Sequence, residues 1–140
     1  MRSLITGIGG FAGGHLAAAL LERDAEVAGI DTATGQRLES ILDHITFTKG
    51  DIRKADAIRD AVNQFHPEVI YHLAAITNVG RAWKKRRETL EVNVVGTSAV
   101  LEVAAELEPK PTVVLASTGE IYGPPPPDSR PLTEDDPTHP

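Results

Sequence analysis

Short apolar runs alternate with longer segments of helical periodicity along the chain. The short runs have the length and composition of buried strands. The longer segments carry apolar residues on one side of a helix, most clearly Ile58, Ala61, Val62 and Phe65 at i, i+3, i+4 and i+7. The pattern predicts strands at Arg2–Thr6, Glu26–Ile30, Ile45–Lys49, Val69–Leu73 and Thr112–Ala116, and helices at Phe11–Arg23, Gln36–Asp43, Ile58–Phe65 and Leu90–Ala104.

This alternation of strands and helices predicts the βαβ units of an α/β fold. Right-handed crossovers would then build a doubly wound parallel sheet with flanking helices over residues 1–123. From Pro124 onward the chain is rich in proline, which is excluded from helix interiors and central strands. We therefore expect an irregular loop over residues 124–140.

The composition is that of one globular domain, with 140 residues, 41% hydrophobic and 24% charged. No apolar run approaches the ~20 residues of a membrane-spanning helix, and the first one is too short for a signal peptide. The chain has no cysteine, and we predict no metal site. A net charge of −6 argues against nucleic-acid binding. We expect a cytoplasmic protein that binds neither nucleic acid nor membrane.

The segment TGIGGFAG lies between the first predicted strand and the first predicted helix, where glycine loops bind phosphate. Gly7 would permit the tight turn, Gly10 the approach of backbone to a pyrophosphate, and Gly13 the close packing of helix on sheet. The helix N-terminus would add free N–H groups and the positive end of its dipole. The alternative is a β–α turn without a ligand.

An acidic residue, Asp31, follows the second predicted strand. A carboxylate there can accept hydrogen bonds from both hydroxyls of an adenosine ribose and would repel a 2′-phosphate. The pattern predicts NAD in preference to NADP, on a Rossmann-like sheet with strand order 3-2-1-4-5. The alternative is a turn aspartate ahead of Thr32.

Together these motifs resemble those of the extended short-chain dehydrogenases/reductases, which include nucleotide-sugar epimerases, 4,6-dehydratases and 4-reductases. Further segments fall in that family's order over essentially the whole chain, at Gly50–Ile52, Tyr71–Ala75, Asn93–Thr97 and Ser117–Gly123. The resemblance implies hydride transfer between a nicotinamide and a carbon of a nucleotide-sugar. It also implies that a homodimer could form through the fourth helix.

The resemblance places Asp51 at the adenine amino group and Asn93 in support of the active site. With the glycine loop, it implies cofactor contacts at Gly7, Gly10, Phe11, Gly13, Asp31, Asp51, Ile52, Leu73, Ala74, Ala75, Asn93 and Ser117. Asp51 could instead cap the next helix, and Asn93 could be a structural bridge. His72 lies inside an apolar strand, so we expect a buried histidine with satisfied hydrogen bonds.

Ser117 and Thr118 follow the fifth predicted strand. Ligands of parallel sheets bind beyond the carboxyl ends of the strands, so these hydroxyls are expected near the nicotinamide and the substrate. By resemblance Thr118 is the catalytic Ser/Thr, and Glu120 matches the glutamate base of the 4,6-dehydratases. Some 4-reductases also carry this glutamate, and Gly119 departs from the Asp or Ser of the dehydratases, so the reaction stays open.

The family's general acid–base is a tyrosine with a lysine four residues later. Tyr71 and Tyr122, the two tyrosines here, are followed at that spacing by Ala75 and Pro126. We therefore expect the cofactor-binding front half of a longer enzyme, without turnover of its own. Two alternatives are a non-catalytic dinucleotide-binding module and an inactive fragment destabilised by the exposed edge of the fifth strand.

A basic cluster, Arg81–Arg87, lies where the fourth helix is expected to begin. Cations there oppose the helix dipole. We expect either pairing with Glu88 and Glu91 at i+3 and i+4 or an anion such as a substrate diphosphate. Within the family, Val79–Trp83 is most similar to the 4-reductases, which hints at a GDP-sugar 4-reductase or 4,6-dehydratase.

Overall fold

A computed structural model of the chain describes residues 1–124 and 130–139. Five parallel strands form one sheet in the order β3-β2-β1-β4-β5, which confirms the doubly wound, Rossmann-like α/β fold. The strands are β1 (Arg2–Thr6), β2 (Glu26–Asp31), β3 (Thr46–Lys49), β4 (Val69–His72) and β5 (Thr112–Leu115). β1 is central because Ser3 lies opposite both Val27 of β2 and Val69 of β4.

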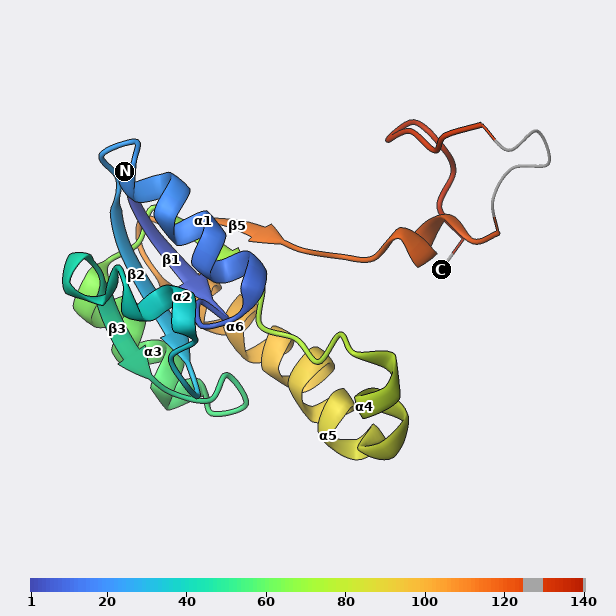
Figure 1. Cartoon of the computed structure of the whole chain (residues 1–140), viewed down its shortest axis with the longest axis horizontal. Coiled ribbons are helices and arrows are strands. Elements are labelled where there is room, and N and C mark those ends of the chain that lie inside the picture. The colour runs from blue at the N-terminus through green and yellow to red at the C-terminus, as the bar shows by residue number, and fades with distance from the viewer. Residues whose placement is uncertain (125–129, 140) are drawn as a thin grey trace.

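Helices cover both faces of this sheet (Figure 1). On one face, α1 (Phe11–Leu21) and α2 (Gln36–Glu39) pack over a core that includes Ile5. On the other face, α3 (Ala55–Phe65) and α6 (Thr97–Glu106) pack over a core that includes Leu4. Adjacent residues of β1 serve opposite cores because successive side chains of a strand point to opposite faces.

Two predicted helices differ in the structure. The segment predicted as one helix at Gln36–Asp43 is α2 followed by a 3₁₀ turn at Leu42–His44. The helix predicted at Leu90–Ala104 starts earlier: α4 (Val79–Lys84) precedes α5 (Arg86–Leu90), and a π-helical segment, Glu91–Gly96, joins α5 to α6. Such π-helical segments often occur at functional sites. Apolar periodicity alone does not reveal one, because the period changes only locally.

After β5 the chain runs away from the sheet into a separate loop region (Figure 1). A 3₁₀ helix, Gly119–Tyr122, comes first. The backbone N–H of His139 donates a hydrogen bond to the Ile121 carbonyl at 2.6 Å. The predicted loop over residues 124–140 agrees with the turn seen in residues 130–139, whereas residues 125–129 and 140 lie outside the described residues.

None of the helices in residues 1–124 and 130–139 has the length and apolar character needed to cross a membrane.

Candidate functional site

A cavity of about 400 Å³ opens at the carboxyl ends of β1, β2, β3 and β4. The segments that follow these four strands form its walls, as expected for an open parallel sheet. Eight of the predicted cofactor-binding residues line it: Gly7, Gly10, Asp31, Asp51, Ile52, Leu73, Ala74 and Ala75.

The glycine loop between β1 and α1 is built by close backbone approaches. Gly7 has φ of 75°, and a Cβ there would lie 2.7 Å from the Ala74 nitrogen. A Cβ on Gly13 would lie 2.3 Å from the Gly7 oxygen. Gly7 therefore permits the turn and Gly13 permits the helix to pack on the strand end, as the spacing predicted. This leaves Gly10, the N-cap residue of α1, at the cavity.

Asp31, the last residue of β2, is hydrogen-bonded to the glycine loop. Its Oδ2 accepts from the Gly9 N–H at 2.9 Å, and its Oδ1 accepts from the Thr32 N–H at 2.7 Å. These bonds fix the carboxylate at the cavity wall and combine the two strongest sequence motifs in one place.

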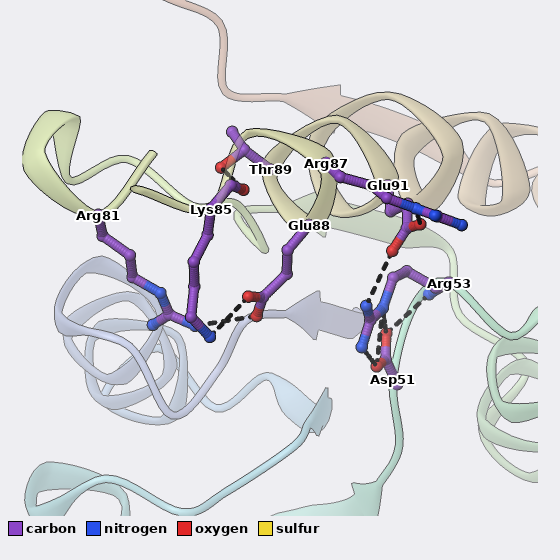
Figure 2. Close-up of polar contacts among 8 residues, drawn as sticks. All are labelled: Asp51, Arg53, Arg81, Lys85, Arg87, Glu88, Thr89 and Glu91. Carbon is purple, nitrogen blue, oxygen red and sulfur yellow. Dashed lines mark hydrogen bonds and ion pairs between the residues drawn. The ribbon is translucent and has the colours of Figure 1, made fainter. Parts of the chain in front are cut away.

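Asp51 lies at the other end of the cavity, in the loop between β3 and α3, and does not cap α3. Its Oδ1 accepts from the Arg53 N–H at 3.0 Å, and the Arg53 guanidinium binds both of its oxygens (Figure 2). The hydrogen bonds from Arg53 lower the pKa of Asp51. Arg53 Nη1 also lies 3.4 Å from Glu91 Oε2, and Arg87 Nε donates to Glu91 Oε1 at 2.8 Å. These contacts form an ionic bridge that links the loop between β3 and α3, at this end of the cavity, to α5 and the π-helical segment.

Three of the five basic side chains of the cluster, Arg81, Lys85 and Arg87, pair with Glu88 or Glu91, as one of the two expectations had it. Glu88 lies 3.2 Å from Arg81 Nη2 and 2.7 Å from Lys85 Nζ (Figure 2). These interactions lower the pKa of Glu88, chiefly through the hydrogen bond from Lys85. The guanidinium of Arg86 stacks over Trp83, 4.6 Å from the ring centre.

Several lining residues were missed by sequence reasoning: Gly9, Ile30, Thr32, Ala33, Thr34, Gly35, Arg53, Ile76 and Val92. Most of them had a signal. Thr32–Gly35 follow Asp31 directly, so the same strand end carries them to the cavity. Val92 carried none, since its position depends on the π-helical segment.

Besides Ser117, three predicted cofactor contacts lie outside this cavity lining. Phe11 is 83% exposed at the start of α1, and Gly13 packs against the strand end. The Asn93 amide holds a backbone group: its Oδ1 accepts from the Ile76 N–H at 2.8 Å, and its Nδ2 donates to the Ile76 carbonyl at 3.1 Å. These contacts are those of the structural bridge that was the alternative for Asn93.

The predicted catalytic segment is not brought to the cavity. Ser117, Thr118 and Glu120 are exposed beyond β5, and none of them is among the residues that line the cavity. Thr118 Oγ1 accepts from the Glu120 N–H at 3.2 Å and so caps the short 3₁₀ helix. We expected these residues near the site because they directly follow β5. The direction in which the chain leaves this strand carries them away from the cavity instead.

His72 confirms the prediction of a buried histidine with satisfied hydrogen bonds. Its side chain is 4% exposed and contacts Thr6 Oγ1 and Thr97 Oγ1. Burial lowers the pKa of the imidazole.

In residues 1–124 and 130–139, no group of three or more His, Cys, Asp or Glu side chains is placed to hold a metal ion.

Comparisons with known proteins agree with this geometry. Residues 3–140 match the model of the NAD dependent epimerase/dehydratase family. A UDP-glucose 4-epimerase of Mycolicibacterium smegmatis is 37% identical over 145 residues, covering 100% of this chain and 45% of that protein. A UDP-N-acetyl-alpha-D-glucosaminuronate decarboxylase of Bacillus cytotoxicus is 36% identical, covering 96% of this chain and 41% of that protein.

Among solved structures, the UDP-glucose 4-epimerase of Thermus thermophilus in complex with NAD superposes with a TM-score of 0.86. It is 34% identical, and the match covers 100% of this chain and 45% of that one. The chain therefore spans less than half the length of these relatives. Fold, cavity and sequence match together show that the chain belongs to the NAD dependent epimerase/dehydratase family.

Proposed function

We propose that this chain is the cofactor-binding part of an enzyme that modifies a nucleotide-sugar, and that NAD binds in the cavity. The observation that carries the proposal is the joint placement of the glycine loop and the Asp31 carboxylate on one cavity wall. A phosphate-binding loop and a ribose-binding acid are the two fixed requirements of a dinucleotide site.

The residues present fit the parts of a dinucleotide. The backbone from Gly7 to Gly10 and the N-terminus of α1 would hold the pyrophosphate. Asp31 would accept from the ribose hydroxyls, and Asp51 with Ile52 would contact the adenine. The Asp31 carboxylate would repel a 2′-phosphate, which favours NAD over NADP.

The bound cofactor would supply hydride transfer between its nicotinamide and a sugar carbon, and the chain's own residues would bind and orient it. By resemblance we assign the catalytic hydroxyl to Thr118, supported by Ser117, and a proton-transfer role to Glu120. Because these side chains are exposed beyond β5, the assignment requires the segment to approach the cavity in the active enzyme.

The names of the relatives support a UDP-sugar as the substrate class, since one is an epimerase and the other a decarboxylase of UDP-sugars. The GDP-sugar alternative rests on Val79–Trp83 and on the likeness to a GDP-mannose 4,6-dehydratase. The reaction itself stays open between epimerisation, dehydration and reduction, because Gly119 and Glu120 match no single subgroup.

A fluorescence titration tests the proposal. NADH is added to the 140-residue chain while its emission and the quenching of Trp83, the single tryptophan, are followed. We expect saturable binding of NADH and at least about tenfold weaker binding of NADPH, because the Asp31 carboxylate would repel the 2′-phosphate and about 1.4 kcal/mol corresponds to a factor of ten in affinity. Absence of saturable NADH binding by a folded chain would overturn the proposal.

A further inference from the structure

A chain of hydrogen bonds runs behind the cavity wall formed by residues 73–76. Thr6 Oγ1 lies 2.7 Å from His72 Nδ1, and His72 Nε2 lies 2.9 Å from Thr97 Oγ1. Thr6 is fully buried and His72 is 4% exposed. Three elements are joined by these contacts, since Thr6 ends β1, His72 ends β4 and Thr97 begins α6.

The directions of these bonds define the protonation of His72. A threonine hydroxyl has a single hydrogen to donate. Thr97 Oγ1 donates its hydrogen to the Asn93 carbonyl at 2.8 Å, so it can only accept from His72, and Nε2 must carry the proton. At the other end, Thr6 Oγ1 accepts from the Ala74 N–H at 3.3 Å and has its own hydrogen free for Nδ1.

The two ends of this hydrogen-bond network contact the cavity wall at residues that lie two positions apart, Ala74 and Ile76. One end is the Ala74 N–H, and the other is Asn93, whose amide binds both backbone groups of Ile76. Ala74 and Ile76 both line the cavity. The same wall packs directly on the glycine loop, since a Cβ on Gly7 would lie 2.8 Å from the Ala74 Cα.

We propose that His72 is a positioning residue for the bound cofactor: as the neutral Nε2–H tautomer it links Thr6 to Thr97 and Asn93, and thereby fixes the backbone of residues 74–76 as a wall of the cavity. The proposal rests on the proposed function, because it assigns the wall to dinucleotide binding. A purely structural link between β4 and α6 would make neither of two predictions that the positioning role makes. These are which ring nitrogen of His72 is protonated, and which backbone amides lose protection when the network is broken.

Protonation of both ring nitrogens would remove the hydrogen bond that Thr6 donates to Nδ1. Nδ1–H would then point at Thr6 Oγ1, which already accepts from Ala74 and would have to turn its hydrogen away. Burial of the ring lowers the pKa of His72 in agreement with this. Buried polar networks of this kind tolerate little loss, because each broken bond leaves a desolvated polar group.

The first test measures the tautomer without any ligand. Long-range ¹H–¹⁵N spectra of the 140-residue chain at neutral pH distinguish a protonated Nε2 from a protonated Nδ1. We expect the neutral Nε2–H form for His72. A neutral Nδ1–H form, or a doubly protonated ring, would overturn the proposal.

The second test uses Thr97→Val, which removes the hydroxyl with little change of shape, and Thr97→Ser, which keeps it. We expect Thr97→Val to speed hydrogen exchange at the Ala74 and Ile76 amides about tenfold relative to the amides of β1. Thr97→Ser should restore slow exchange. The control is Ser98→Ala, because Ser98 is exposed and, within residues 1–124 and 130–139, its hydroxyl donates to Glu102 alone. Equal acceleration at every amide would mean a purely structural role.

The third measurement is the dissociation constant for NADH. We expect Thr97→Val to raise it about tenfold and Thr97→Ser to return it to near the wild-type value. Equal NADH affinity in wild type and Thr97→Val would overturn the positioning role and leave the proposed function standing. If the wild-type chain binds no NADH, the proposed function fails, and the tautomer and exchange measurements still decide the network.

Discussion

Two segments that follow neighbouring strands of the sheet differ sharply in how they are held. The segment after β4, residues 73–76, packs on the glycine loop and donates backbone hydrogen bonds to Thr6 Oγ1 and Asn93 Oδ1. The segment after β5, residues 116–122, is exposed from Ala116 to Glu120, and its Thr118 hydroxyl accepts from the Glu120 N–H of the same segment. Both were predicted to line one site, and only the first does so among the described residues.

The difference shows which part of the site this chain builds by itself. The cofactor-binding part consists of backbone groups and short side chains that a buried network and close glycine contacts hold in place. The proposed catalytic part consists of hydroxyl and carboxylate side chains on a segment with little packing. A strand end brings a motif to the correct edge of the sheet, whereas packing on a second element decides where its side chains point.

The largest expected effect comes from the same substitution, glycine to alanine, at Gly7, which packs against residues 73–76, and at Gly119 in the segment after β5. Gly7→Ala places a side chain at φ of 75° and against the Ala74 backbone, so we expect a loss of about 2–4 kcal/mol in the free energy of unfolding. A methyl group on Gly119 would meet no other atom within 4 Å, so Gly119→Ala should change this free energy by less than about 0.5 kcal/mol. Urea denaturation followed by circular dichroism measures both. Equal losses would contradict the comparison.

A charge substitution tests cofactor binding next. Asp31→Asn removes the carboxylate that binds the glycine loop and is proposed to bind ribose, so we expect NADH affinity to fall about tenfold. Asp135→Asn removes the same charge from the exposed tail and should leave the affinity within about twofold. Titration of NADH fluorescence measures both, and a comparable loss in the two variants would place the cofactor elsewhere.

A pH titration of stability tests the buried histidine. Since burial lowers the pKa of His72, the unfolded chain binds its proton more tightly than the folded one. The contribution of His72 is therefore complete above the ordinary histidine pKa of 6.5 and is lost as the pH falls below it.

We expect thermal unfolding of the wild-type chain to show this decline below pH 6.5, and His72→Gln to show a flatter profile even though it is less stable at neutral pH. His139→Gln, which replaces an exposed histidine of the tail, should keep the wild-type slope. A wild-type slope in His72→Gln would show that His72 is not the group that titrates.

The smallest expected effect concerns the ionic bridge over the cavity. Arg53→Gln removes the links to Asp51 and Glu91, and we expect NADH affinity to fall by no more than about threefold because exposed ion pairs contribute little. The loss should shrink as salt is added. Arg130→Gln breaks the ion pair with Asp136 in the tail and should leave NADH affinity unchanged. A large, salt-independent loss for Arg53→Gln would mean a direct contact with the cofactor.

The sequence allowed the sheet and half of the site to be predicted, because short-range rules governed both. Strand–helix alternation and the placement of Gly7, Gly13 and Asp31 follow from local backbone geometry. The ligand role of Asn93 and the location of Thr118 were harder, because they depend on contacts between elements. Asn93 lies within the π-helical segment, which leaves no pattern in the sequence, and its Oδ1 accepts from the Ile76 N–H.

Amide chemical shifts of the 140-residue chain during a titration with NAD⁺ show residue by residue where the cofactor binds. We expect the largest changes at Gly9, Gly10, Thr32, Ala74 and Ile76, all of which line the cavity, and small changes at residues 117–122. Changes concentrated beyond β5, or at the opposite ends of the strands near His66 and Glu108, would contradict this expectation.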